Sequence, residues 1–326
     1  MKTSLKWPMR VVLVLIMAGV GLGYFGPYEP VNVQVSFDES VIGSDVEAYF
    51  AAREARFSDI RPDNQKRVVW FDGQDVKTPQ VLVYVHGFSA SAQELRPVPD
   101  LMAGALGANL VYTRLTGHGR SGEAMATATA QAWMTDLAEA LAVARKIGDE
   151  VILLSTSTGG TLVALAALQP ELMRQVKGAI FVSPNFAISD PLAPLLTLPA
   201  ARYWLPLVAG RTWSFEPRND LQEQFWTTSY PSTAVIPVAA LVKEVWLHDW
   251  TQVQLPALFW YSDADTVVRP AATDTMAASW GGDSSVVKVE LGEGDDPNSH
   301  VVAGAILSPS QTDRAVSNMV QWIDTL

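Results

Sequence analysis

The stretch "EVILLSTSTGGTLVALAALQ" (150–169) decides the fold of this chain. It opens with a short, almost continuous apolar run and closes with a longer apolar run of helical composition. Between the two runs stand Ser-Thr-Ser-Thr and a pair of glycines, at 155–160. A buried strand that turns sharply into a buried helix is typical of the parallel sheet of an α/β protein.

The same rhythm continues on both sides of this stretch. A helical pattern at 132–148 precedes it, with Gly148 as a stop signal, and an amphipathic helix at 312–326 closes the chain. Further apolar runs of strand length lie along the chain, separated by helical patterns. They are 81–88, 109–119, 178–184, 257–263 and 285–291. We therefore predict an α/β fold in which helices flank a mostly parallel central sheet, with the main domain at 81–326.

One insertion interrupts the rhythm. Residues 185–252 are rich in proline and tryptophan and contain no clear strand. A segment this long inside a compact domain usually has structure of its own or a function. We predict a helical cap that is inserted after the strand at 178–184, which follows the helix that starts after the turn at 155–160.

Residues 26–80 carry local patterns but no recognisable motif. We predict a strand at 31–37 from its alternation and another strand at 66–73. Between them, 44–57 has the pattern of a helix, with Ser44 as its N-cap and Glu47 completing a capping box. We interpret 26–80 as an N-terminal extension that includes the first strands.

The N-terminus combines positive charge with an apolar run. Lys2, Lys6 and Arg10 precede residues 11–25, which are uncharged. This pattern fits a cleaved signal peptide or an uncleaved signal anchor at 1–25. We favour the anchor, because a span that begins at Trp7 approaches the roughly 20 residues that a bilayer requires. The basic residues then stay inside, and the rest of the chain is exported and held at a bacterial-type inner membrane, outside the cytoplasm.

Composition excludes several classes of function. The 326 residues carry a net charge of -11, which disfavours nucleic acid as a partner. The chain has no cysteine, so it has no disulfide, no thiolate nucleophile and no cysteine-ligated zinc. Its four histidines are scattered without metal-ligand spacing, so we expect no metal and no cofactor.

The turn at 155–160 carries a candidate nucleophile, Ser157. The pattern is that of the nucleophile elbow, G-x-S-x-G, with Ser155 in place of the first glycine and Gly159 as the second. Small neighbours are needed because the turn is tight, and Gly160 lets the helix pack close to the strand. The N–H of Thr158 is then one candidate donor to an oxyanion.

A serine nucleophile needs a base, and the base needs a carboxylate to orient it. After an elbow of this kind the chain order of the triad is Ser, acid, His. Two histidines follow Ser157 in the sequence. His248 falls in the cap, whereas His300 follows the last strand, where we expect the base. Asp263 and Asp265 are both candidates for the acid because they end the strand at 257–263.

Other polar residues near these motifs receive different interpretations. We expect the second oxyanion donor in the loop after 81–88 and choose the N–H of Phe88. We expect His86 to hold this loop by hydrogen bonds rather than act as a base. Asp295 and Asp296 are interpreted as solvated loop charges.

Taken together, these motifs resemble the α/β-hydrolase superfamily, in the branch of monoglyceride lipases, lysophospholipases and serine aminopeptidase-like hydrolases. The resemblance covers roughly residues 80–326. It implies that Asp265 is the acid, because the family pattern G-x-x-D-x-V-V aligns with Ser262, with Asp263 as the fallback. It also implies a structural role for His118. The matching pieces are His86-Gly87-Phe88, "LTGHGRSG" (115–122), "STSTGG" (155–160), "YSDADTVV" (261–268) and His300.

The function expected from this pattern is a serine hydrolase that cleaves carboxylic esters of apolar acyl groups through Ser157, Asp265 and His300. The partner is a small-molecule acyl ester, and the membrane anchor makes a lipid a candidate. Three alternatives stay open: an acyltransferase on the same triad, an amide or peptide hydrolase, and a non-catalytic membrane-anchored binding protein. A dehalogenase of this fold would need aspartate at position 157. The sequence leaves the oligomeric state open.

Overall fold

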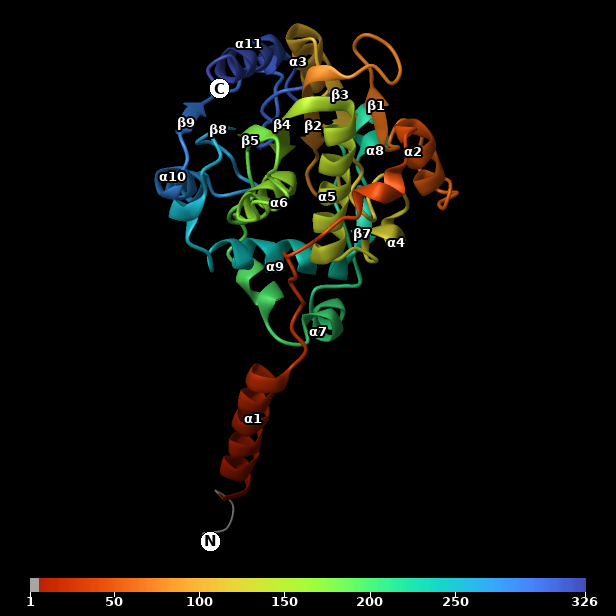
Figure 1. The fold of residues 1–326 in the computed structure, drawn as a ribbon. Coiled ribbons are helices and arrows are strands. Elements are labelled where there is room, and N and C mark those ends of the chain that lie inside the picture. Colours follow the sequence, from red (N-terminus) through yellow and green to blue (C-terminus); the bar gives the residue numbers. More distant parts are fainter. Residues whose placement is uncertain (1–5) are drawn as a thin grey trace.

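The computed structural model describes residues 6–326 (Figure 1). Helix α1, Lys6–Phe25, projects as a rod from a rounded body. Lys2, the first basic residue of the predicted N-terminal pattern, lies outside the described residues.

A seven-stranded sheet forms the centre of the body, in the order β1-β3-β2-β4-β5-β8-β9. Strand β1 runs antiparallel to β3, and every other pair is parallel. The predicted α/β fold with a mostly parallel sheet is therefore confirmed. The strands are β1 Arg67–Val69, β2 Thr78–Val85, β3 Asn109–Tyr112, β4 Gly148–Thr156, β5 Val176–Val182, β8 Ala257–Tyr261 and β9 Ser284–Lys288.

Helices cover both faces of this sheet, because its strands are apolar on both sides. In β2, Val81 and Val83 belong to one hydrophobic cluster and Leu82 and Tyr84 to the other. The first cluster packs under α5 (Ala130–Ile147), α6 (Thr158–Ala167) and α10 (Pro270–Ser279). The second packs under α3 (Val98–Leu106) and α11 (Thr312–Ile323). A short helix, α4 (Gly122–Met125), follows β3.

The segment before β1 packs along the face of α5 and α6, and two predictions about it are wrong. Residues 31–37 form no strand, because the side chain of Gln169 takes their hydrogen bonds, accepting from Val35 N at 3.2 Å and donating to Val33 O at 2.7 Å. After a 3-10 turn, η1 (Glu39–Ile42), helix α2 (Val46–Glu54) is capped by Asp45, which accepts from Ala48 N at 2.8 Å. Ser44 is therefore not the N-cap.

Buried charges join this segment to the body. The ammonium of Lys66 contacts the carboxylates of Asp136, at 2.9 Å, and Glu139 on α5. Glu54 pairs with Arg114 at 2.7 Å, again with both side chains buried. A buried charge that loses its partner is strongly destabilising, so these pairs fix the extension against the sheet domain.

The cap, residues 185–252 between β5 and β8, is mostly helical. It contains a two-stranded antiparallel sheet, β6-β7, although we predicted no strand there. Its strands have three residues each, too short to give an alternating pattern. The elements are η2 Ala193–Thr197, α7 Ala201–Val208, β6 Thr212–Ser214, α8 Asp220–Phe225, β7 Ser229–Pro231, η3 Ser232–Val235, α9 Ile236–Val245 and η4 Trp250–Gln252.

Candidate active site

Ser157 stands in the turn between β4 and α6, with φ 52° and ψ −119°. A positive φ is costly for a residue with a side chain and is typical of functional turns. The turn is tight against its surroundings: a Cβ at Gly159 would lie 2.2 Å from Val85 O, and one at Gly160 would lie 2.8 Å from the Cβ of Pro184. Both glycines are therefore required by close approach.

Ser155 occupies the position where the elbow pattern has glycine. It is fully buried, and its hydroxyl donates to Ile180 O on the neighbouring strand at 3.0 Å. The hydroxyl is therefore satisfied, which explains why serine is tolerated here.

The structure joins His300 to Asp265 and places Asp263 elsewhere. The Nδ1–H of His300 donates to Asp265 Oδ2 at 2.8 Å, and both residues are buried. The other carboxylate oxygen of Asp265 accepts from the N–H groups of Val267, at 2.8 Å, and Val268, at 3.0 Å. Asp263 is 62% exposed at its side chain and pairs with Lys288.

The loop before His300 is held by two buried carboxylates, so our interpretation of Asp295 and Asp296 as solvated charges is wrong. Asp296 accepts from the backbone N–H of His300 at 3.1 Å and of Val301 at 3.0 Å. Asp295 accepts from the hydroxyl of Ser310 and from the backbone of Gly292. These carboxylates replace water for backbone groups that the loop would otherwise bury unsatisfied.

The surroundings of His300 stabilise its charged form. Burial alone lowers the pKa of the imidazole, but the charge and hydrogen bond of Asp265, with smaller contributions from Glu94 and Asp296, outweigh it and raise the pKa of His300. A ring that readily accepts a proton on its free Nε2 suits a general base.

Two backbone N–H groups belong to residues that line the cavity together with Ser157. Those of Phe88 and Thr158 donate no hydrogen bond within residues 6–326. Both residues line the cavity that Ser157 lines. The backbone at Gly87 passes close to the serine, because a Cβ there would lie 3.1 Å from the Cβ of Ser157. Both N–H groups are thus free to bind an oxygen next to Ser157.

The remaining histidines make structural contacts and do not line the cavity that contains Ser157. Nε2 of His86 accepts from Leu115 N at 3.1 Å and ties the loop after β2 to the loop after β3. Burial lowers the pKa of His86 to about 4, so the ring is neutral. The His118 ring packs against it at 5.0 Å between centroids. His248 contacts Glu244 on the cap, outside the cavity.

Glu94 is a cavity residue that the sequence did not reveal. Its Oε2 accepts from Gly87 N at 2.8 Å and from the hydroxyl of Tyr84 at 3.0 Å. Glu94 therefore positions the loop that carries Phe88. Burial raises the pKa of Glu94 to about 7. The weak signal was an acidic residue within the otherwise uncharged segment 87–95.

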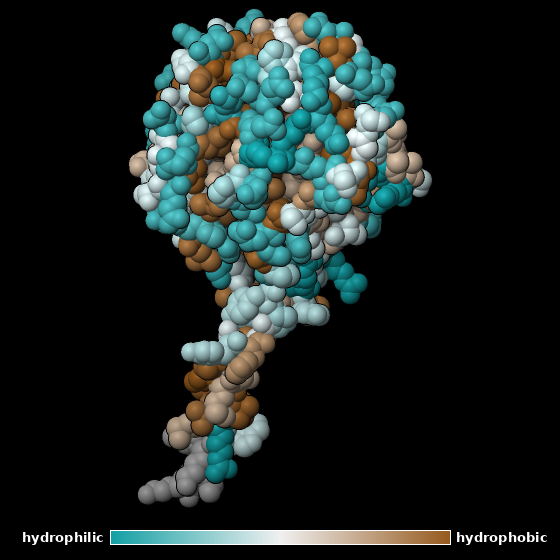
Figure 2. Space-filling model, in the orientation of Figure 1, coloured by the Kyte–Doolittle hydropathy of each residue, from teal (hydrophilic) through white to brown (hydrophobic). Residues whose placement is uncertain are grey.

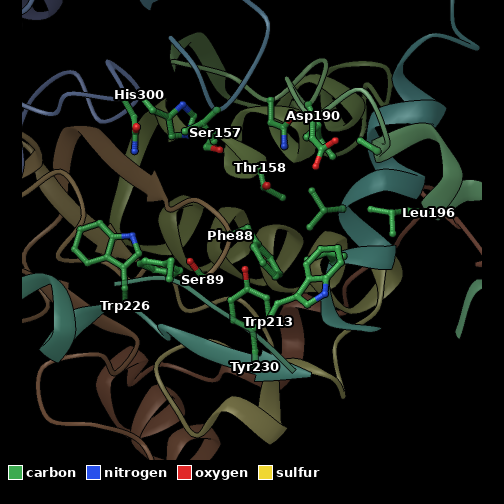
Figure 3. A pocket seen from close by; sticks show the side chains of 18 of the residues that line it. Phe88, Ser89, Ser157, Thr158, Asp190, Leu196, Trp213, Trp226, Tyr230 and His300 are labelled. Atoms are coloured by element: carbon green, nitrogen blue, oxygen red, sulfur yellow. The ribbon is translucent and has the colours of Figure 1, made fainter. Parts of the chain in front are cut away.

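The cavity has a volume of about 690 Å³ and is mainly apolar. Figure 3 shows Ser157 and His300 together on one side and Leu196 of the cap on the other, with Trp213 and Tyr230 between them below Phe88. A cavity of this size and lining suits a ligand with a long apolar part.

A family model described as the alpha/beta hydrolase family matches residues 82–305. The chain belongs to this family. A search of curated proteins finds no match.

Solved structures share the fold at low sequence identity. A structure of LipS and LipT, two metagenome-derived lipolytic enzymes, is 19% identical with a TM-score of 0.64, covering 82% of this chain and 100% of that one. Monoacylglycerol lipase from Paleococcus ferrophilus is 14% identical, TM-score 0.57, covering 79% and 97%. A soluble variant of monoglyceride lipase from Saccharomyces cerevisiae is 12% identical, TM-score 0.58, covering 80% and 91%. At these identities the likeness is one of fold.

Proposed function

We propose that this protein is a serine hydrolase that cleaves carboxylic esters of apolar acyl groups. The observation that carries the proposal is one arrangement: Ser157 on a strained turn lines the same cavity as His300, and His300 is hydrogen-bonded to the buried carboxylate of Asp265. These are the parts of a Ser-His-Asp triad, in the chain order of this fold.

In the proposed mechanism, Nε2 of His300 takes the proton of the Ser157 hydroxyl while Oγ attacks the ester carbonyl. The carboxylate of Asp265 stabilises the imidazolium that forms. The N–H groups of Phe88 and Thr158 bind the oxyanion of the tetrahedral intermediate. His300 then gives its proton to the leaving alcohol, and an acyl-enzyme remains. A water molecule activated by His300 attacks the acyl carbon and releases the acid.

The lining of the cavity supports an apolar acyl group as the part of the substrate that is recognised. Four leucines and three tryptophans of the cap line the cavity. Burying a chain of methylenes against them contributes about 0.8 kcal/mol per CH₂. Two of the similar folds belong to a monoacylglycerol lipase and a monoglyceride lipase, which agrees with this choice.

We further propose that α1 is a signal anchor. Among residues 6–326, Trp7–Phe25 is the one helix long and apolar enough to cross a membrane, and none of it is buried in the body. Figure 2 shows it as a largely apolar stalk below the body. The basic residues before the span favour a location of the catalytic domain outside the cytoplasm, on a bacterial-type inner membrane.

The proposal is tested with p-nitrophenyl esters from acetate to palmitate. The full-length protein in detergent micelles is compared with Ser157→Ala. We expect turnover that disappears in the variant and rises with acyl length. Activity that survives in Ser157→Ala would show that the nucleophile is misassigned. A folded protein that hydrolyses no ester would favour acyl transfer, an amide substrate or a binding role.

A further inference from the structure

One segment of the cap has an unusual composition. Residues 191–210, "PLAPLLTLPAARYWLPLVAG", contain a single charged side chain, Arg202, in a chain whose net charge is -11. The segment forms η2 and α7. A surface element of an acidic soluble protein would carry charge on its outer face.

The segment is apolar on its outer face as well as its inner face. Leu196 and Leu205 are buried against Ile236 of α9. On the opposite side, Tyr203 is 72% exposed and Leu207 is 78% exposed. An exposed apolar surface of this kind marks a site of interaction with a protein or a membrane. We call this outer face the apolar cap surface; it consists of Leu192, Leu195, Leu198, Tyr203, Leu207 and Val208.

The chain that leaves α1 binds to this same segment. Ala200 N donates to Pro27 O at 2.7 Å, two residues after α1 ends. Glu29, whose side chain is 4% exposed, makes two hydrogen bonds of 2.6 Å with the guanidinium of Arg202. The contact neutralises the single charge of the segment. It also leaves no free linker between the proposed span and the cap, so the segment lies at the base of α1 (Figure 1).

The apolar cap surface also forms part of the rim of the cavity. Leu192, which is 64% exposed, and Val208, which is 73% exposed, both line the cavity that holds Ser157. The cavity therefore meets the apolar cap surface on one side of its opening, whereas the exposed charged residues Asp190, Glu216 and Arg218 line other parts of it. An acyl chain that enters across the apolar side of the rim is transferred from one apolar surface to another, whereas a polar group gains little from contact with this side.

We propose that the apolar cap surface lies in the interface of the bilayer that α1 spans, and that the substrate is a lipid ester whose acyl chain passes from this leaflet directly into the cavity. This inference rests on the proposed ester hydrolase for its substrate, but the membrane contact stands on the cap and linker alone. A bilayer is favoured over a protein partner because the docked linker holds this surface beside the span.

Membrane contact is tested without reference to activity. The chain has no cysteine, so Leu207→Cys provides a single site for an environment-sensitive fluorophore. The matched control is Leu101→Cys, because Leu101 is 44% exposed and belongs to helix α3, which lies at the end of the body away from α1 (Figure 1). With the full-length protein reconstituted into phosphatidylcholine vesicles, we expect a blue-shifted emission at 207 that quencher-labelled lipid suppresses, and neither effect at 101. Equal emission and quenching at both sites would overturn the proposal.

Delivery of the substrate is tested with Tyr203→Asp/Leu207→Asp, since neither side chain lines the cavity. We expect hydrolysis of a long-chain monoacylglycerol in the same vesicles to fall about tenfold or more, because two apolar groups that the proposal places in the bilayer interface are replaced by charges. Hydrolysis of a water-soluble short-chain ester should stay unchanged. Unchanged rates on both esters would refute delivery from the bilayer. If the wild type hydrolyses neither ester while position 207 is quenched, the proposed reaction fails and the membrane contact stands.

Discussion

Replacing Asp265 by asparagine tests the proposed charge arrangement with little change of shape. Asp265 accepts three hydrogen bonds, from His300 Nδ1 and from the N–H groups of Val267 and Val268. The asparagine carbonyl can keep the two backbone bonds, so the fold should survive. The side-chain NH₂ of asparagine then donates to Nδ1 of His300, so the proton of the ring moves to Nε2. A protonated Nε2 can no longer accept the proton of Ser157.

The wrong tautomer costs about 10⁴-fold in kcat in the well-studied serine protease triad. That factor corresponds to about 5 kcal/mol of transition-state stabilisation. Asp263→Asn is the matched control, because Asp263 lies two residues away and its pair with Lys288 is exposed. We expect Asp263→Asn to keep its kcat and to change stability by about 1 kcal/mol at most.

The assay is kcat for a p-nitrophenyl ester, with the thermal unfolding midpoint measured on the same samples. Loss of activity in Asp263→Asn but not in Asp265→Asn would refute the reasoning and transfer the role of the acid to Asp263. A parallel fall in unfolding midpoint and kcat in Asp265→Asn would mean that the carboxylate acts on stability rather than on the ring.

Three further predictions concern pH and stability. Because the pKa of His300 is raised, kcat/KM should fall on the acid side with a midpoint above the usual imidazole pKa of about 6.5. A pH–rate profile whose midpoint lies below this usual pKa would contradict the prediction. The stability that the charged ring contributes should be fully present below the usual pKa and be lost as pH rises through the raised pKa. Gly159→Ala should lower the free energy of unfolding by about 3 kcal/mol or more, because its Cβ would lie 2.2 Å from a backbone carbonyl oxygen. Gly104→Ala on α3 should raise the free energy of unfolding by about 0.5–1 kcal/mol, because a Cβ there meets no atom within 4 Å. Denaturant titrations that rank the two variants otherwise would refute the packing argument. Lys66→Met removes the buried ammonium that Asp136 and Glu139 share. Asp136 then loses its ion-pair partner, whereas Glu139 keeps Arg53, so the change should cost about 3 kcal/mol. Lys177→Met removes an exposed pair and should cost less than about 1 kcal/mol; equal unfolding midpoints of the two variants would disprove the argument.

The sheet and the turn at Ser157 could be predicted because their determinants are local. A strand buried on both faces is apolar throughout, and the turn needs Gly159 whatever surrounds it. The order of the chain also suggested that Asp265 and His300 meet, since parallel strands end at the same edge of the sheet.

Features that depend on distant partners could not be predicted. The absence of a strand at 31–37 follows from Gln169, a residue of another part of the chain. Asp295, Asp296 and Glu94 resemble ordinary loop residues in the sequence, and only the folded loops show that backbone N–H groups enclose their carboxylates. The two-stranded sheet of the cap was too short to leave a pattern.

Because of the buried charges in the extension, the folding unit of this protein begins earlier in the chain than the family model does. The family model begins at residue 82, after Lys66 and Glu54. A chain cut at that point would retain Asp136, Glu139 and Arg114 in a core without their counterions. The part of the chain that the family model matches is therefore not transferable by itself: a chimera that moves it behind another N-terminal segment must carry the extension along, or supply a new cation for α5.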